Sequence, residues 1–193
     1  MTELIFATHN LHKLQELQAL LPAGINLISL DEYGIMQEIP ETGATLEENA
    51  LIKCQFVYNK TGQPCFADDT GLEVEALDGR PGVHSARYAS LRKNDNENIE
   101  KLLYELEGKT HRKARFRTII QLAWDDDYMQ FEGIVNGTIT LEPLGFSGFG
   151  YDPVFIPEGH ERSFAEMDLE EKNTMSHRAR AFEKLVEWLR ENV

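Results

Sequence analysis

The stretch "PCFADDTGLEV" places two carboxylates side by side, at Asp68 and Asp69, after an apolar run. Successive residues of a β-strand point to opposite faces, so both aspartates can face one site only if the strand has already ended. Alternation groups Asp69 with the small residues Cys65 and Ala67, which leave room for a metal ion and phosphates. It groups Asp68 with Phe66. We therefore expect Asp69, at the end of the strand, to act at the site and Asp68 to orient a neighbouring group.

Two predicted helices begin with cations, although the positive end of the helix dipole normally favours Asp and Glu. The first begins "THNLHK" and carries leucines at 11, 14, 17 and 21 on a helical period, and the last begins "SHRAR". The unpaired N–H groups of a helix start form an anion site, so Lys13, His177 and Arg178 suit a phosphate or another electron-rich ligand nearby. The alternative is that these cations are solvated at the surface at a small energetic cost.

Lys53 lies in a helix predicted for residues 46–59, which the capping-box sequence "TLEE" starts. The apolar stripe of this helix consists of Leu46, Ala50 and Val57. At about 100° per residue, Lys53 falls in the middle of that stripe. A lysine there must extend its ammonium to solvent, pair with a carboxylate or contact an anionic ligand, and the sequence leaves these alternatives open.

Glu41 in "IPETG" and Asp152 in "FGYDP" are further candidate metal ligands, although acidic residues on loops are usually only solvated. The Gly-rich sequence "SGFGYDP" offers Phe149 and Tyr151 for stacking on a base, but core packing is the commoner role of either aromatic residue. The sequence contains none of the motifs GxxxxGK[ST], GxGxxG, HExxH and CxxC. The common nucleotide and metal fingerprints therefore do not explain these residues.

The composition sets the class of protein. The 193 residues are 41% hydrophobic, which is ordinary for a globular chain, and we expect a single domain over residues 1–193. No apolar run approaches the roughly 20 residues that span a bilayer, and "MTELIFATHN" has neither a basic leader nor a cleavage site, so we expect a cytoplasmic protein without a membrane partner. A net charge of -14 argues against a nucleic-acid partner, but not against one phosphate ligand held by a few cations and Mg²⁺.

Two other features have ordinary explanations. Cys54 and Cys65 are too few for a disulfide framework or a zinc site, and we expect two buried thiols. The dense basic run "HRKARFR", residues 111–117, is either a solvated loop and strand edge or a patch that steers an anionic ligand.

The sequence predicts both helices and strands. Strands mixed with helices, and consecutive strands in the middle, indicate an α/β chain with a long mixed sheet and helices packed against it. A polar loop is expected over residues 77–90 and a Gly-rich turn over residues 145–155. We expect strands over residues 4–7, 65–68, 114–124, 128–135 and 138–141, and helices over residues 11–21, 46–59 and 96–106, a short one capped by "SFAE" and a last one to Val193.

Six sequence blocks occur in the order and spacing of the noncanonical purine nucleoside triphosphate pyrophosphatase family, which includes inosine triphosphate pyrophosphatase. The chain resembles this family over nearly its whole length. Three positions depart from the family pattern: Thr70 stands where Ser is common, Ser90 where Gly is frequent and Leu144 where Arg is frequent. The blocks are "THNLHK", "ETGATLEENALIK", "ADDTGLEVEALDGRPGVHSARYA", "GFGYDPVF", "SFAEM" and "EEKNTMSHRARAF".

The resemblance implies an elongated α/β fold, in which a mixed β-sheet flanked by helices forms two lobes with a central cleft. It implies a Mg²⁺-dependent hydrolase that converts ITP, dITP and XTP to the monophosphate and pyrophosphate, and so removes deaminated purines from the nucleotide pool. Family members usually dimerise, so the resemblance also implies a homodimer.

The resemblance also assigns site residues. Glu41 and Asp69 become the metal ligands, and Asp69 is also the proposed catalytic base. Residues 8–13 contact the triphosphate, Lys53 contacts phosphate, Thr70 contacts the substrate, and the remaining residues form the base pocket. The substrate-binding residues implied in this way are Thr8, His9, Asn10, Leu11, His12, Lys13, Lys53, Thr70, Phe149, Gly150, Tyr151, Asp152, Lys172, His177 and Arg178.

Two alternative functions are left open at this point. One is a Maf-like nucleotide pyrophosphatase that acts on other modified bases, which a panel of substrates would separate. The other is a non-catalytic nucleotide-binding module. The carboxylates argue against the module, because a protein that only binds nucleotide does not need an aspartate metal site.

Overall fold

The computed structural model describes residues 2–18, 20 and 24–192. Leu21, predicted to continue the first helix, and Val193, predicted to end the last one, lie outside the described residues. Within the described residues, no helix is long and apolar enough to cross a membrane.

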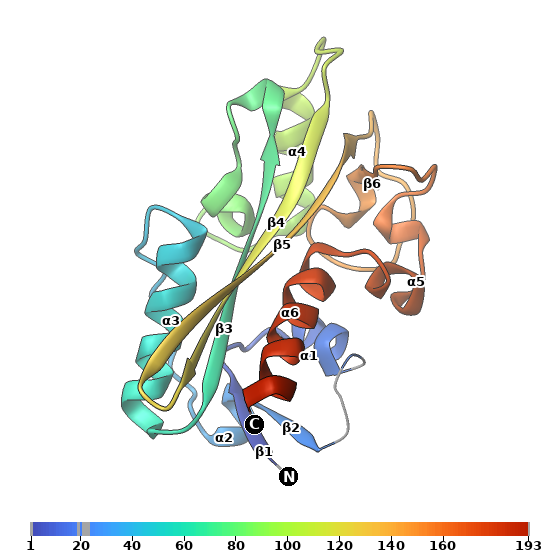
Figure 1. Ribbon diagram of the computed structural model, residues 1–193. Coiled ribbons are helices and arrows are strands. Elements are labelled where there is room, and N and C mark those ends of the chain that lie inside the picture. The colour runs from blue at the N-terminus through green and yellow to red at the C-terminus, as the bar shows by residue number, and fades with distance from the viewer. Residues whose placement is uncertain (1, 19, 21–23, 193) are drawn as a thin grey trace. The chain divides into compact units, whose positions relative to one another are not determined.

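A six-stranded mixed sheet runs in the order β2-β1-β3-β4-β5-β6 (Figure 1). β1 pairs in parallel with both β2 and β3, whereas β5 and β6 are antiparallel. The predicted mixed α/β class is confirmed. The strands are β1 (Thr2–Phe6), β2 (Ile25–Ser29), β3 (Cys65–Val74), β4 (Lys113–Trp124), β5 (Asp127–Ile139) and β6 (Phe155–Pro157).

The predicted long helices are present with local signals at their ends. Thr45 caps α3 by accepting a hydrogen bond from the Glu48 N–H, and Gly62 ends this helix in the left-handed conformation. The α-helices are α1 (Leu11–Gln18), α2 (Leu30–Tyr33), α3 (Leu46–Thr61), α4 (Asp95–Glu105), α5 (Leu169–Asn173) and α6 (His177–Asn192), and the 3-10 helices are η1 (Glu75–Leu77), η2 (Gly82–Arg87), η3 (Asp152–Val154) and η4 (Phe164–Glu166).

The chain forms two compact units. The first contains the residues up to Asp69, Thr118–Gly133 and the residues from Arg178 onward, and the second contains Thr70–Arg117 and Ile134–His177. The chain therefore passes from one unit to the other directly after Asp69 and directly after His177. Two of the residues singled out from the sequence lie at these crossings.

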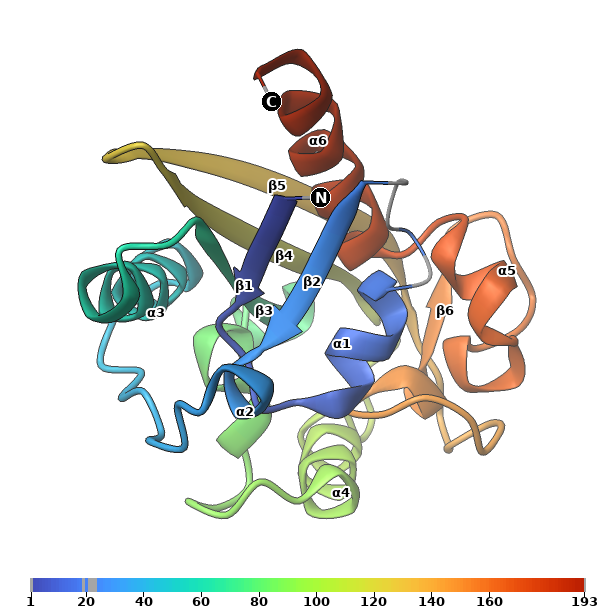
Figure 2. The same cartoon turned by 90° about the horizontal axis from the view of Figure 1, so that it is seen from below.

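In the first unit, helices cover both faces of the strands (Figures 1 and 2). Phe6 and Phe66 pack with Leu185 of α6 and with Leu17 of α1. The strand residues that alternate with them, such as Ala67, pack against α3. Both faces are apolar, as expected for parallel strands buried on two sides.

The second unit has a core of its own, and it is rich in aromatic side chains. Phe116 of β4 lies with its ring centroid 4.7 Å from that of Phe155 and 6.2 Å from that of Phe164. Leu102 of α4 and Val154 belong to the same fully buried cluster. Val154 lies at the end of the Gly-rich segment that precedes β6, so this core holds that end of the segment.

Several predicted boundaries are wrong. The strands predicted over residues 128–135 and 138–141 are one strand, β5, because Gly137 is not a turn residue. A Cβ at Gly137 would lie 2.3 Å from the Ile156 carbonyl oxygen, so glycine is needed where β6 approaches closely. β2, α2 and β6 were not predicted, and the loop predicted over residues 77–90 begins at the last residue of η1 and contains η2.

Candidate active site

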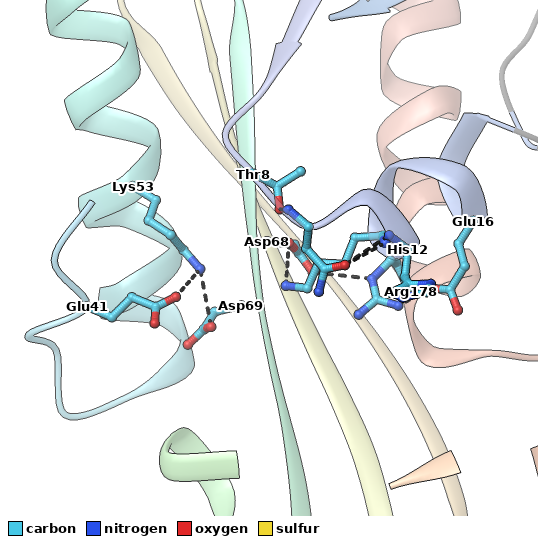
Figure 3. A network of polar contacts seen from close by, with 10 residues as sticks. Thr8, His12, Glu16, Glu41, Lys53, Asp68, Asp69 and Arg178 are labelled. Atoms are coloured by element: carbon cyan, nitrogen blue, oxygen red, sulfur yellow. Dashed lines mark hydrogen bonds and ion pairs between the residues drawn. The ribbon is translucent and has the colours of Figure 1, made fainter. Parts of the chain in front are cut away.

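β3 carries Asp68 and Asp69 on opposite faces, and it does not end between them. The strand continues through Thr70 to Val74, so the predicted strand end is wrong. Aspartate has low β-propensity, but pairing and burial on both faces override that preference. Asp68 meets cations of α1 and α6, whereas Asp69 meets a cation of α3, and the alternation predicted from the sequence is confirmed (Figure 3).

Asp68 lies in a buried network of charges on the face covered by α1 and α6. Its Oδ1 accepts a hydrogen bond from Lys13 Nζ at 2.8 Å, and its Oδ2 accepts one from Arg178 Nε at 3.3 Å. Arg178 also donates to the carboxylate of Glu16, and its exposed fraction is only 2%. Burial alone would raise the pKa of Asp68, but Lys13 and Arg178 outweigh it and hold the pKa below its usual range.

Lys53 of α3 lies between two carboxylates on the other face of β3 (Figure 3). Its Nζ donates to Glu41 Oε1 at 2.9 Å and to Asp69 Oδ1 at 3.3 Å. Lys53 is 7% exposed, so it does not reach the solvent, and the alternative of a carboxylate partner is confirmed. Burial opposes charge on Lys53, but Asp69 and Glu41 outweigh it and raise its pKa.

Asp69 has one carboxylate oxygen without a partner. Its Oδ2 is buried and makes no hydrogen bond, whereas its Oδ1 bonds to Lys53. Burial raises the pKa of Asp69, while the charges of Lys53 and Lys13 act in the opposite direction. An unpaired buried carboxylate oxygen is energetically costly, and such groups are concentrated at functional sites.

The donor set around Asp69 fits a hard divalent cation. No group of three His, Cys, Asp or Glu side chains with metal-binding geometry occurs in the part of the chain that the structure describes. Mg²⁺ does not need such a group, because it is commonly held by one or two carboxylates plus substrate phosphates. The unpartnered Oδ2 of Asp69 and the neighbouring carboxylate of Glu41 match that requirement.

The residues before α1 form a tightly bonded turn. The Asn10 side-chain oxygen accepts from the N–H groups of His12 and Lys13 at 3.0 and 3.3 Å, and so caps the helix. Asn10 N–H itself bonds to Thr8 Oγ1 at 3.1 Å. The expectation that these helix N–H groups are left for an anion is wrong for His12 and Lys13. The Lys13 ammonium, in the first turn of α1, remains a cation that could contact an anionic ligand.

His9 and Leu11 of the same segment, whose contacts with the triphosphate stay predictions, have side chains in different surroundings. The His9 ring bonds through Nδ1 to Asp31 at 2.7 Å and through Nε2 to the Gln37 carbonyl oxygen at 3.3 Å. This side chain ties the turn to α2 and to the segment that follows α2. The Leu11 side chain is 62% exposed, so it belongs to no core cluster.

A second group of predicted site residues comes together in the second unit. Lys172 Nζ lies 2.7 Å from Asp152 Oδ2 and 5.1 Å from the centroid of the Phe149 ring. Both charged residues are buried. Tyr151 belongs to the core cluster and donates its hydroxyl to the Ser85 carbonyl oxygen at 2.9 Å, so its role in core packing is confirmed, and its contact with the base stays a prediction.

Comparison with known proteins gives the family. A profile of the Ham1 family matches residues 4–188. The chain belongs to the Ham1 family. It is 55% identical over 190 residues to a dITP/XTP pyrophosphatase of Porphyromonas gingivalis, covering 98% of each chain, and 47% identical over 189 residues to a dITP/XTP pyrophosphatase of Bacillus subtilis, covering 96% of each.

Solved structures of Ham1 proteins have the same fold. The Staphylococcus aureus Ham1 protein is 36% identical with a TM-score of 0.90, and each chain is covered completely. A HAM1 protein from Coxiella burnetii is 41% identical with a TM-score of 0.91, covering 99% of this chain and 100% of the other. The resemblance found in the sequence is thereby confirmed.

In this Ham1 chain, two predicted base-pocket residues lie in different units. His177 stacks on Phe116, with ring centroids 4.6 Å apart and an interplanar angle of 13°. Arg178 is the next residue, yet its ion pairs join it to Glu16 and Asp68, the group that holds Lys13. The assignment of Arg178 to the purine stays a prediction.

Sequence reasoning missed two carboxylates beside the predicted site residues. Glu16 of α1 is 4% exposed and bonds to Arg178, and Asp95 of α4 accepts a hydrogen bond from the Gly150 N–H at 2.7 Å. Glu16 follows Lys13 by three residues, so a charged pair on one face of a helix was its available signal. Asp95 gave no signal, because its partner is 55 residues away.

The two cysteines and the basic run over residues 111–117 make structural contacts. Cys54 and Cys65 are free, fully buried thiols, as predicted. In the basic run, Arg112 donates to the carbonyl oxygens of Leu106 and Ile139, and Arg115 pairs with Glu73 at 2.6 Å. These contacts tie the basic run to neighbouring carbonyl oxygens and to Glu73 of β3, and the alternative of a patch that steers a ligand stays untested.

Proposed function

We propose that this chain is a dITP/XTP pyrophosphatase that also accepts ITP and that removes deaminated purine nucleotides from the nucleotide pool. Relatives that are about half identical over nearly the whole chain carry the name dITP/XTP pyrophosphatase. The observation that carries the proposal within the structure is Asp69, whose buried Oδ2 has no partner beside the Lys53–Glu41 pair. A phosphate-transfer site needs such an oxygen for a metal ion or for a water proton.

Glu41 and Asp69 would hold Mg²⁺. When bound, Mg²⁺ neutralises charge on the triphosphate and polarises the attacked phosphorus. The position of Lys53 between the two carboxylates supports this proposal, because it shows that the pair already attracts a cation. Removal of divalent cations with EDTA is expected to abolish hydrolysis, and added Mg²⁺ is expected to restore it.

The cations of the first unit would bind the phosphates. Lys53 is buried and Lys13 is half-buried, their ammonium groups bond to Asp69 and Asp68, and each can stabilise negative charge on the leaving pyrophosphate. Asp69 would position or deprotonate the attacking water. A carboxylate that binds Mg²⁺ directly is a poor base, so positioning is the role that we favour for it when the metal is present.

The Phe149, Asp152 and Lys172 group would recognise the base. The Phe149 ring offers a stacking surface, and the Lys172–Asp152 pair fixes a hydrogen-bond donor beside it. A donor aimed at the 6-keto oxygen of hypoxanthine or xanthine would meet the 6-amino group of adenine instead, which leaves the donor unpaired. ATP is therefore expected to be a poor substrate.

Other parts of the proposal rest on the resemblance alone. A single cleft that holds both residue groups, the contacts of Thr8 and Thr70 with substrate, a homodimer and a cytoplasmic location stay predictions. The Maf-like alternative is kept as a rival function, and the same substrate panel with other modified bases tests it.

One assay tests the proposed function. ITP is incubated with Mg²⁺ and the chain, and pyrophosphate is resolved from phosphate. The expected products are IMP and pyrophosphate in one step, with dITP and XTP cleaved in the same way and ATP far more slowly. Primary release of IDP and phosphate would reject attack at the α-phosphorus, and preference for other modified bases would favour the Maf-like alternative.

A further inference from the structure

The Gly-rich segment that carries Phe149 is fixed from the inside by Asp152. Asp152 Oδ2 accepts from the Phe149 N–H at 3.0 Å and from Lys172 Nζ at 2.7 Å. A Cβ at Gly148 would lie 2.2 Å from this same oxygen, so only glycine fits there. The peptide plane before Phe149 is therefore held by a buried carboxylate.

The same segment is fixed from the outside by Asp95. The Gly150 N–H donates to Asp95 Oδ2 at 2.7 Å, the short end of the range for an N–H···O hydrogen bond. Asp95 is the first residue of α4, and the rest of α4 is anchored in the core of this unit through Ile99 and Leu102. The anchor therefore comes from a rigid element outside the segment.

Together the two bonds determine the direction of the Phe149 side chain. The N–H groups of Phe149 and Gly150 belong to the two peptide planes that flank the Phe149 Cα, and each is bonded to a carboxylate. Fixing both planes fixes φ and ψ of Phe149, and hence the direction of its Cα–Cβ bond. Without Asp95, the plane after Phe149 loses this anchor.

We propose that Asp95 is a positioning residue that holds the Phe149 ring in place for stacking on the purine base. The inference rests on the proposed function, because Phe149 is the proposed stacking surface. Asp95 does not contact the substrate itself and acts through the Gly150 N–H. Stacking is present in both the ground state and the transition state, so its loss is expected to raise KM more than it lowers kcat.

The test compares Asp95→Ala with Glu97→Ala. Both changes remove one exposed carboxylate from the first turn of α4, but only Asp95 bonds to the Gly-rich segment. Asp95→Ala is expected to raise KM for ITP about fivefold to twentyfold with kcat within about twofold, the scale of one charge-assisted hydrogen bond. Glu97→Ala should leave both constants within about twofold, and Asp95→Asn should recover most of KM, because its amide oxygen still accepts from Gly150.

A double variant tests whether Asp95 acts through Phe149. In a Phe149→Ala background, Asp95→Ala should have no further effect on KM, because the ring that it positions is absent. An equal effect in both backgrounds, or equal effects of Asp95→Ala and Glu97→Ala, would overturn the inference while the wild type still cleaves ITP. Failure of the wild type to cleave ITP would instead reject the proposed function and the inference together.

Discussion

Asp68, on the face of β3 covered by α1 and α6, bonds through both carboxylate oxygens, whereas Asp69, on the face covered by α3, bonds to Lys53 through only one. Both are buried, so exposure does not separate them. The difference in partners separates a carboxylate that stabilises the fold from one that is left able to bind or react. Asp68 has its pKa lowered by cations that outweigh burial, and Asp69 has its pKa raised by burial.

The largest expected effect is on catalysis at Asp69. Asp69→Asn keeps the size of the side chain. It removes the negative charge that would hold a cation and the basic oxygen that would accept a proton from water. We expect the rate of ITP hydrolysis at saturating Mg²⁺ to fall by about 10²–10⁴-fold, the usual range for loss of such a group. A larger loss of activity from Asp68→Asn, at equal folded fractions, would reverse the roles of the two faces.

The next effect is on stability at Asp68. Asp68→Asn leaves the half-buried Lys13 and the buried Arg178 without their shared carboxylate, although Glu16 still pairs with Arg178. Breaking a buried ion pair by removing one partner costs about 3–5 kcal/mol, and we expect a loss of that size in urea unfolding at neutral pH. Asp69→Asn should be at least as stable as the wild type. Equal destabilisation by the two changes would show that the faces do not differ.

Lys53 provides a smaller test of the Asp69 face. Lys53→Met keeps the apolar stem but removes the cation that Glu41 and Asp69 share. We expect activity to fall about tenfold and stability at neutral pH to fall by about 1–3 kcal/mol. Lys60→Met is the matched control, because Lys60 lies on the same helix and is exposed. If both variants behave like the wild type, the Lys53 ion pairs contribute nothing measurable.

The parts of the fold that the sequence predicted are those with strong local signals. The Thr45 cap and the apolar stripe predicted α3, which is confirmed. The lysine in that stripe left three alternatives open, and the structure shows the one with carboxylate partners. The break predicted between the strands over residues 128–135 and 138–141 is absent, and the close approach of β6 explains why a glycine stands at 137. The strand was also expected to end at the two aspartates, although burial on both faces carries it through them.

The parts of the site that the sequence did not predict depend on distant pairs. Arg178 and Glu16 are 162 residues apart, and Gly150 and Asp95 are 55 apart. Neither pair has a periodicity or a turn signal, because only the tertiary packing of α6 on α1, and of the Gly-rich segment on α4, creates the contact. The strand pattern singled out Asp69, whereas its roles as metal ligand and catalytic base, the metal-ligand role of Glu41 and the base-pocket role of Lys172 came from the family resemblance, and all of these roles stay predictions.

The smallest expected effect, the pH dependence of stability, is also the one in which the two faces act with opposite sign. The folded pKa of Asp68 lies below the usual value of 3.8, so its contribution is complete well above pH 3.8 and is lost as the pH falls toward the folded value. Between about pH 5 and about pH 3 the loss amounts to about 1 kcal/mol. The folded pKa of Asp69 lies above 3.8. Between pH 3.8 and that folded pKa the native state therefore holds more protons than the unfolded chain, and stability falls as the pH rises.

Urea unfolding without metal at several pH values, on the wild type and on both Asn variants, measures these opposite slopes. The deficit of Asp68→Asn relative to the wild type should shrink as the pH falls below 3.8, because the unfolded wild-type chain then takes up the proton. The advantage of Asp69→Asn should also vanish on acidification, because the wild-type carboxyl is then protonated and no longer a buried charge. If both variants deviate from the wild type in the same direction at neutral pH, the unpartnered oxygen of Asp69 imposes no electrostatic cost, and the contrast between the two faces of β3 fails.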